Sequence, residues 1–60
     1  MEKLMTIDQV SEMLQIKRAT IYSWTHTRKI PFIKVGGVLR FREKEVSNWI
    51  DAQVRETKES

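Results

Sequence analysis

The sequence predicts a mainly α-helical fold with a small β-hairpin, in the order helix, turn, helix, two-stranded hairpin and closing helix. Two helical stretches joined by three residues open the chain, two apolar runs flank Gly36-Gly37, and an amphipathic stretch closes it. At 60 residues, with no visible linker, the chain is expected to form a single domain over 1–60. Its ordered core is expected at about 5–55, with residues 1–4 and 56–60 disordered.

The first helix is expected to begin after Thr6. Thr6 and Gln9 have the Thr-x-x-Gln spacing of a capping box, in which each side chain satisfies a backbone N–H of the other residue. Ile7, Val10 and Leu14 follow at spacings of three and four, so they form one apolar stripe. This stripe predicts a helix that ends near Leu14.

A second helix is predicted from Arg18 to about Thr27, after the short connection Gln15-Ile16-Lys17. Ile21 and Trp24 are its expected inward residues. Its β-branched residues lower the intrinsic helix propensity, so it should depend on tertiary packing. Two short helices joined in this way have the spacing of a helix-turn-helix.

A β-hairpin is predicted after Pro31, which ends any helix and favours extended backbone before it. A two-residue Gly36-Gly37 loop would pair Val35 with Val38 and split the apolar residues between the two faces.

A three-residue loop over 35–37 would instead pair Lys34 with Val38, and Ile33 with Leu39. Ile33, Leu39 and Phe41 would then share the core face, and Lys34 and Arg40 would point outward together. The three-residue loop is therefore preferred. Two adjacent cations are unfavourable unless an anion lies between them, which favours a phosphate contact there.

The closing helix is predicted from Glu43 to about residue 55. Val46, Trp49, Ile50 and Val54 lie on one face of it at helical spacing. Trp24 and Trp49 are expected in the core because each lies on an apolar stripe, although a role as stacking platforms for single-stranded nucleic acid is the alternative.

Positive charge is concentrated in the middle of the chain. Residues 17–44 carry eight lysines and arginines against one acidic residue, Glu43, which gives that segment +7 in a chain of net charge +3. Such a block is expected of a surface that binds a polyanion, since neutralising phosphates drives nucleic-acid affinity. The alternative is a solvated basic face without a partner.

Several function classes are disfavoured. The chain has no cysteine and one histidine, His26, so neither a disulfide nor a metal site is expected, and no cofactor or small-molecule ligand. There is no nucleophile–base set at suitable spacing, which predicts that the chain is not an enzyme. No apolar run is long enough for a signal peptide or a membrane span, so a cytoplasmic protein is expected.

An ordered set of motifs over about residues 5–51 resembles the excisionase-type DNA-binding domains, relatives of the mercury-resistance regulator superfamily. The motifs are Thr6-Ile7-Asp8-Gln9-Val10, Leu14, Arg18-Ala19-Thr20-Ile21-Tyr22, Ile30-Pro31-Phe32-Ile33-Lys34-Val35-Gly36-Gly37, Arg40-Phe41-Arg42 and Val46-Ser47-Asn48-Trp49-Ile50. The resemblance implies a winged helix-turn-helix that binds double-stranded DNA. Its second helix would lie in the major groove, and its hairpin wing against the backbone or the minor groove.

The resemblance makes five residues of the second helix DNA-facing candidates: Arg18, Thr20, Tyr22, Ser23 and His26. Arg18 and Ser23 have side chains suited to base edges, and phosphate contact is the alternative for Arg18. Tyr22 would contact phosphate or cover the helix pair, and His26 would be a surface residue or a groove contact. The expected phosphate contacts are Lys17, Arg28, Lys29, Lys34, Arg40 and Arg42.

Two residues depart from the family pattern. Lys17 stands where a helix-capping serine is common, and Val38 stands where the wing often has an arginine. The implied role is an excision factor in DNA recombination or a small transcriptional regulator, with further copies on adjacent sites or a recombinase as partner. The alternative is a protein-interaction module that docks a recombinase or polymerase through the acidic side of the last helix or an exposed Phe32. A fragment of a larger recombinase or transposase is a third interpretation.

Overall fold

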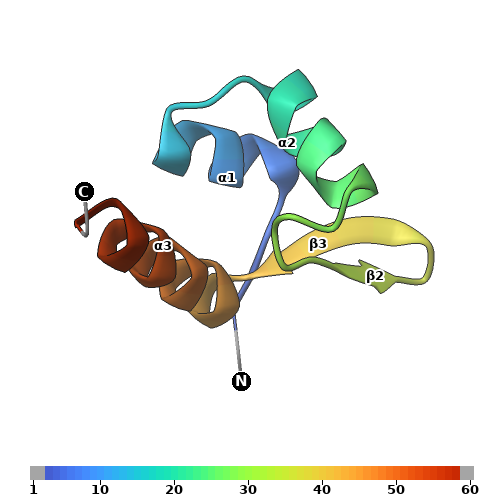
Figure 1. Cartoon of the computed structure of the whole chain (residues 1–60). Coiled ribbons are helices and arrows are strands. Elements are labelled where there is room, and N and C mark those ends of the chain that lie inside the picture. Colours follow the sequence, from blue (N-terminus) through green and yellow to red (C-terminus); the bar gives the residue numbers. More distant parts are fainter. Residues whose placement is uncertain (1–2, 59–60) are drawn as a thin grey trace.

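The chain folds into helices and short strands in the order β1 (Leu4–Met5), α1 (Ile7–Leu14), α2 (Arg18–His26), β2 (Ile33–Val35), β3 (Val38–Arg42) and α3 (Glu43–Lys58). The computed structural model describes residues 3–58. In Figure 1 the hairpin of β2 and β3 extends to one side of α1 and α2, and α3 leaves β3 in the other direction. The predicted winged helix-turn-helix architecture is confirmed, with one further strand in front of it.

The strand missed from the sequence is β1, Leu4–Met5. It pairs antiparallel with β3, Leu4 opposite Arg42 and Met5 opposite Phe41, and gives a sheet of order β1-β3-β2. The prediction of disorder is therefore wrong for Leu4, while residues 1–2 lie outside the described residues. Met5 is buried beside Phe41. Because its side chain is held in the core, the backbone of residues 4–5 is held next to β3, where it can form the strand.

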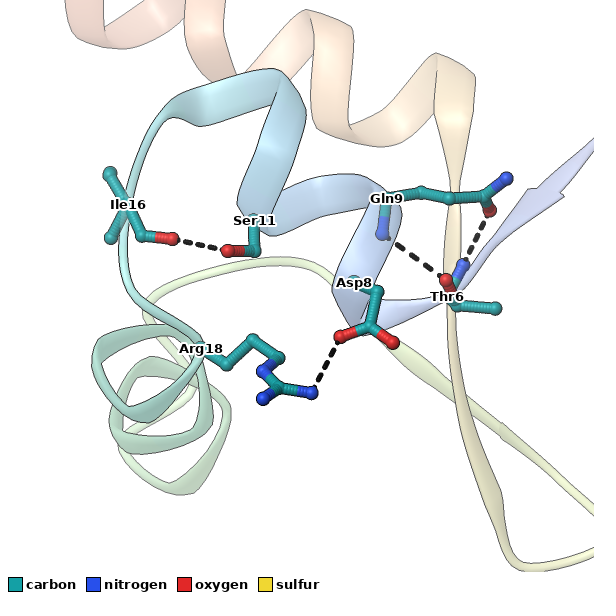
Figure 2. Close-up of polar contacts among 6 residues, drawn as sticks. All are labelled: Thr6, Asp8, Gln9, Ser11, Ile16 and Arg18. Atoms are coloured by element: carbon teal, nitrogen blue, oxygen red, sulfur yellow. Dashed lines mark hydrogen bonds and ion pairs between the residues drawn. The ribbon is translucent and has the colours of Figure 1, made fainter.

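Helix α1 spans Ile7–Leu14, as predicted, and begins with the expected capping box. The Thr6 N–H donates to Gln9 Oε1 at 2.9 Å, and the Gln9 N–H donates to Thr6 Oγ1 at 3.2 Å (Figure 2). At the other end Gln15 adopts a left-handed conformation with φ 59°. The Ile16 N–H then donates to the Ser11 carbonyl, and the Ser11 hydroxyl donates to the Ile16 carbonyl at 2.6 Å (Figure 2), which ties the turn to α1.

Helix α2 spans Arg18–His26, in agreement with the prediction. Lys17 is its N-cap and makes no side-chain capping bond, as its departure from the family pattern implied. The helix ends in a Schellman motif: the Lys29 N–H donates to the Trp24 carbonyl at 2.8 Å and the Arg28 N–H to the Thr25 carbonyl at 3.3 Å. Arg28 occupies the position of this motif that glycine usually takes, with φ 58°.

The predicted hairpin is present, but its preferred register was wrong. Strands β2, Ile33–Val35, and β3, Val38–Arg42, are joined by the two-residue Gly36-Gly37 loop, so Val35 pairs with Val38 and Lys34 with Leu39. Both glycines have positive φ, 60° and 85°, the values of a type I′ turn. That turn matches the right-handed twist of paired strands, and this preference outweighed the burial of Ile33 that had favoured the longer loop.

The register determines which face each wing residue occupies. Residues that are paired across the two strands share a face, and faces alternate along each strand. Lys34 therefore shares a face with Leu39, whereas Arg40 pairs with Ile33 on the opposite face. The expected outward pair of Lys34 and Arg40 does not form.

Helix α3 spans Glu43–Lys58 and begins where it was predicted. It continues three residues beyond the predicted end, so residues 56–58 are helical, while 59–60 lie outside the described residues. Val46 at its start is fully buried, and Trp49 and Ile50 are half-buried. Val54, the last member of the predicted apolar stripe, is 57% exposed, because the helix has passed the edge of the core.

The core gathers side chains from every layer of the fold. Its buried residues are Met5, Val10, Ile21, Ile30, Phe41 and Val46. Trp24 and Trp49 pack against this cluster with ring centroids 5.8 Å apart and planes inclined by 57°, within the range of favourable aromatic pairs, and join α2 to α3. The prediction that the tryptophans pack in the core is confirmed. Phe32 also packs there and is half-buried, so the expectation that it is exposed was wrong.

Candidate nucleic-acid interface

One side of α2 faces away from the core. Ile21 is fully buried, and the exposed residues Ala19, Tyr22, Ser23 and His26 recur at spacings of three, one and three, which places them on one stripe. We call these four residues the outer face of α2. Tyr22 is the most prominent, a large side chain that is 49% exposed. The outer face carries no lysine, arginine or acidic side chain.

The threonines of α2 and of its C-cap are less available for recognition. The Thr25 hydroxyl donates to the Tyr22 carbonyl at 2.7 Å, and the Thr27 hydroxyl donates to the Ser23 carbonyl at 3.2 Å. Bonds of this kind return a side chain to its own helix. Thr20, a predicted DNA contact, is half-buried and lies beside the outer face rather than on it.

Exposed cations lie at both ends of α2. Lys17 and Arg18 are at its amino end, and Arg28 and Lys29 follow its carboxyl end. The four were all predicted, and the fold places them in two pairs that bracket the uncharged outer face. The arrangement is suited to a duplex, because phosphates flank a groove whose floor presents base edges.

Arg18 has a partner within the chain that sequence reasoning did not anticipate. Its Nη1 donates to Asp8 Oδ1 on α1 at 2.9 Å (Figure 2), and the two side chains are 64% and 69% exposed. Because both groups are well solvated, the ion pair contributes only ~0.2–1 kcal/mol. The pair directs the guanidinium toward α1, and water or a stronger acceptor can replace the carboxylate.

The wing meets α2 along a groove of about 510 Å³. Its lining residues come from both elements and from the turn between them: Tyr22, Thr25, His26, Arg28, Phe32, Lys34 and Leu39. Lys34 and Arg28 thus lie on the same groove as two members of the outer face. The structure therefore brings Lys34 to the candidate interface.

The remaining predicted cations lie elsewhere. Arg40 is on the other face of the wing, half-buried, and its Nη1 donates to the Leu39 carbonyl at 2.7 Å. Arg42 is at the far end of β3, with its Nη1 3.6 Å from Glu45 Oε2. Neither residue joins the group formed by α2 and Lys34.

Two residues of this interface were missed from the sequence. Ala19 was not singled out because alanine carries no recognition chemistry of its own, although its spacing from Tyr22, Ser23 and His26 was visible. Asp8 was part of the first motif and was given no contact of its own. Its contact with Arg18 joins residues ten positions apart, and no local pattern reports such a contact.

A second surface lies on the other side of α2. An apolar groove of about 600 Å³ is lined by Leu14, Ile16, Trp24, Trp49, Ile50, Gln53 and Val54. It lies between the helix-turn-helix and the middle of α3, from Trp49 to Val54. Over residues 3–58 no helix is long and apolar enough to cross a membrane, and no three His, Asp or Glu side chains gather where they could hold a metal ion.

Comparison with known proteins gives one match. A family model described as a helix-turn-helix domain matches residues 4–54, which is most of the chain and includes every element from β1 into α3. The comparisons with curated proteins and with solved structures gave no match.

Proposed function

The chain belongs to an excisionase-like family of helix-turn-helix domains, which supports DNA binding, and we propose that it binds double-stranded DNA sequence-specifically without catalysing a reaction. In this proposal the outer face of α2 enters the major groove. Lys17, Arg28, Lys29 and Lys34 contact phosphates on either side, and Arg18 exchanges Asp8 for a base edge or a phosphate.

One observation carries the proposal. The exposed surface of α2 is uncharged along its middle and has cations at both ends, and the wing adds Lys34 across the adjoining groove. A helix that docked on an apolar protein surface would expose several large apolar residues along that face, whereas Tyr22 is the one large hydrophobic side chain there and carries a hydroxyl group. In a basic face that contacts only solvent, nothing would favour placing the cations on either side of an uncharged stripe.

A salt titration of binding to duplex DNA tests the electrostatic part. Five cations at the interface predict that the logarithm of the binding constant falls with the logarithm of salt concentration with a slope of about −4 to −5. A slope near zero would exclude phosphate contacts as the source of affinity. The fragment should come from selection of bound sequences from a random pool, which also identifies the target.

Variants of the outer face test the orientation. Replacing Tyr22, Ser23 and His26 together by alanine should abolish the preference for the selected sequence, with little effect on folding because the three side chains are exposed. A matched triple replacement at the exposed positions Ser47, Asn48 and Asp51 of α3 should leave the preference intact. Equal effects of the two variants would contradict recognition by α2.

Further copies of the chain are the proposed partners on DNA. One module of this size buries only ~600–1,000 Å² on DNA, so a contact with a neighbouring copy would supply needed affinity. The apolar groove between the helix-turn-helix and α3 is the surface available for that contact. Val54→Lys, at an exposed position, should reduce cooperativity on two adjacent sites and leave the affinity for a single site unchanged.

Unchanged cooperativity in Val54→Lys would contradict the contact between copies. If that variant instead lost binding to a recombinase or polymerase, the chain would dock proteins, as in the alternative function, but through this groove rather than through the acidic side of α3 or Phe32. An excision factor and a transcriptional regulator would use the same DNA interface. Measuring the DNA bend on circularly permuted fragments separates an architectural role from simple occupancy of a promoter.

A further inference from the structure

Ala19 is the one member of the outer face of α2 whose side chain has no polar group. Its position near the start of the helix indicates which part of a DNA duplex that side chain would contact. It is the second residue of α2 and is exposed. In helix-turn-helix proteins the first residues of the recognition helix contact base edges. A residue at this position is therefore expected to lie close to the floor of the major groove.

The chemistry of a methyl side chain restricts what it can recognise there. In the major groove adenine, guanine and cytosine present hydrogen-bond donors and acceptors, and thymine adds an apolar C5-methyl group. An alanine methyl placed against a polar edge would leave that edge without a partner and exclude water from it. Against the thymine methyl it buries apolar surface on both sides.

The neighbouring side chains leave Ala19 accessible. Ala19 is itself exposed, and in the free chain the guanidinium of the neighbouring Arg18 is drawn toward Asp8 of α1 (Figure 2). Tyr22 and Ser23 are one turn further along the same face. Since alanine is short, the backbone of α2 can approach the bases closely at this point.

We propose that Ala19 is a specificity-determining residue that selects a thymine through its C5-methyl group. This inference rests on the proposed function, because it requires α2 to lie in the major groove. It adds that the binding site contains a thymine whose methyl group faces the first turn of α2.

The test replaces each thymine of the selected duplex, one at a time, by deoxyuridine, which lacks only the C5-methyl group. At one position the substitution should weaken binding of the wild-type chain about three- to fourfold, the loss of one buried methyl group at ~0.8 kcal/mol. Ala19→Gly should bind the unmodified duplex about three- to fourfold more weakly. It should also be insensitive to deoxyuridine at that position.

Ala52→Gly is the matched control. Ala52 is exposed in the interior of α3, so this variant has a loss of helix propensity at least as large and no change on the outer face of α2. It should keep the wild-type response to deoxyuridine. Circular dichroism at the assay temperature should show that both variants are folded.

The two proposals fail in different ways. If the wild-type chain prefers its selected duplex and the Tyr22, Ser23 and His26 variant loses that preference, but no deoxyuridine substitution weakens binding, the thymine contact is wrong and the DNA interface stands. The same holds if Ala19→Gly retains the full deoxyuridine effect. If the wild-type chain does not bind duplex DNA, the proposed function itself is wrong.

Discussion

Asp8 Oδ1 accepts a hydrogen bond from Arg18 Nη1 at 2.9 Å, and this contact links the first turn of α1 to the first turn of α2. It places a carboxylate beside one of the cations proposed to contact DNA. When DNA binds, a phosphate or base acceptor must therefore displace the Asp8 carboxylate from Arg18. The pair lowers the net attraction of this end of α2 for DNA and gives Arg18 a defined position before binding.

Asp8→Asn should strengthen DNA binding about two- to fivefold at low salt, because it removes the competing charge and a repulsion toward phosphate. This range corresponds to ~0.4–1 kcal/mol, within the ~0.2–1 kcal/mol of an exposed ion pair. The gain should shrink as salt is added, since exposed charges are screened. Fluorescence anisotropy over a salt series measures both effects.

The same substitution should lower the free energy of unfolding by up to ~1 kcal/mol. It removes the ion pair and the favourable position of Asp8 at the amino end of α1. Asp51→Asn, with the same charge change on α3, is the control and should alter neither the affinity nor its salt dependence appreciably. Weaker binding by Asp8→Asn would mean that Asp8 positions Arg18 for DNA rather than competing for it.

The two cations of the wing should differ in their effect on DNA binding. Lys34→Ala is expected to weaken binding to all sequences and to make the salt slope less negative by about 0.9, the value for one phosphate contact, because Lys34 lies on the groove beside α2. Arg40→Ala should leave the slope unchanged, because Arg40 lies on the other face of the hairpin. Equal losses in the two variants would contradict the assignment of faces.

How far the sequence predicts this fold depends on how local each signal is. The capping box of Thr6 and Gln9 and the buried stripe through Val10 involve residues within two helical turns, and α1 was predicted from end to end. Strand β1 has only two residues, too few for a periodic pattern. It exists because Met5 packs beside Phe41, which is distant in the sequence.

The charged residues of the site could be predicted from the sequence, but their positions relative to one another could not. The basic segment follows from composition, and the DNA-facing candidates on α2 follow from the resemblance to excisionase-type domains. The separation of Lys34 from Arg40 depends on a one-residue difference in loop length, which moves a side chain to the other face. The pairing of Arg18 with Asp8 depends on how two helices cross, and the sequence of neither helix reports it.

The Gly36-Gly37 turn offers a direct test of the register. A Cβ atom built at either glycine would meet nothing within 4 Å, so any loss on substitution comes from the backbone conformation alone. Gly36→Asn should change the free energy of unfolding by less than ~0.5 kcal/mol, because asparagine tolerates the left-handed region and Asn-Gly favours type I′ turns. Gly36→Val should lower it by ~1–2 kcal/mol.

Urea denaturation measures the two turn variants, and cross-strand nuclear Overhauser effects between residues 34 and 39 report the register itself. If Gly36→Asn were as destabilising as Gly36→Val, the turn would not be of type I′. A strong contact of Lys34 with Val38 in place of Leu39 would support the three-residue loop.

Gln15 and Arg28 both adopt left-handed conformations at the ends of helices, φ 59° and 58°, and each is a residue type for which that region is unfavourable. Gln15→Gly should raise the free energy of unfolding by ~0.5–1 kcal/mol, after allowing for the greater freedom of glycine in the unfolded chain. The bond from Gln15 Nε2 to the Glu12 carbonyl is exposed, so its loss subtracts little. DNA affinity should not change.

Arg28→Gly should raise the free energy of unfolding by a similar amount, because it relieves the unfavourable conformation at residue 28. It should also weaken DNA binding and make the salt slope less negative by about 0.9, because Arg28 is a proposed phosphate contact. Arg28→Lys separates the two effects, since it keeps both the charge and the strain and should change neither quantity appreciably. Denaturation and binding measured on the wild-type chain, Gln15→Gly, Arg28→Gly and Arg28→Lys decide the question. If Arg28→Gly were more stable and bound DNA as tightly as the wild-type chain, the arginine would have no role at the interface, and the unfavourable conformation at residue 28 would have no function to explain it.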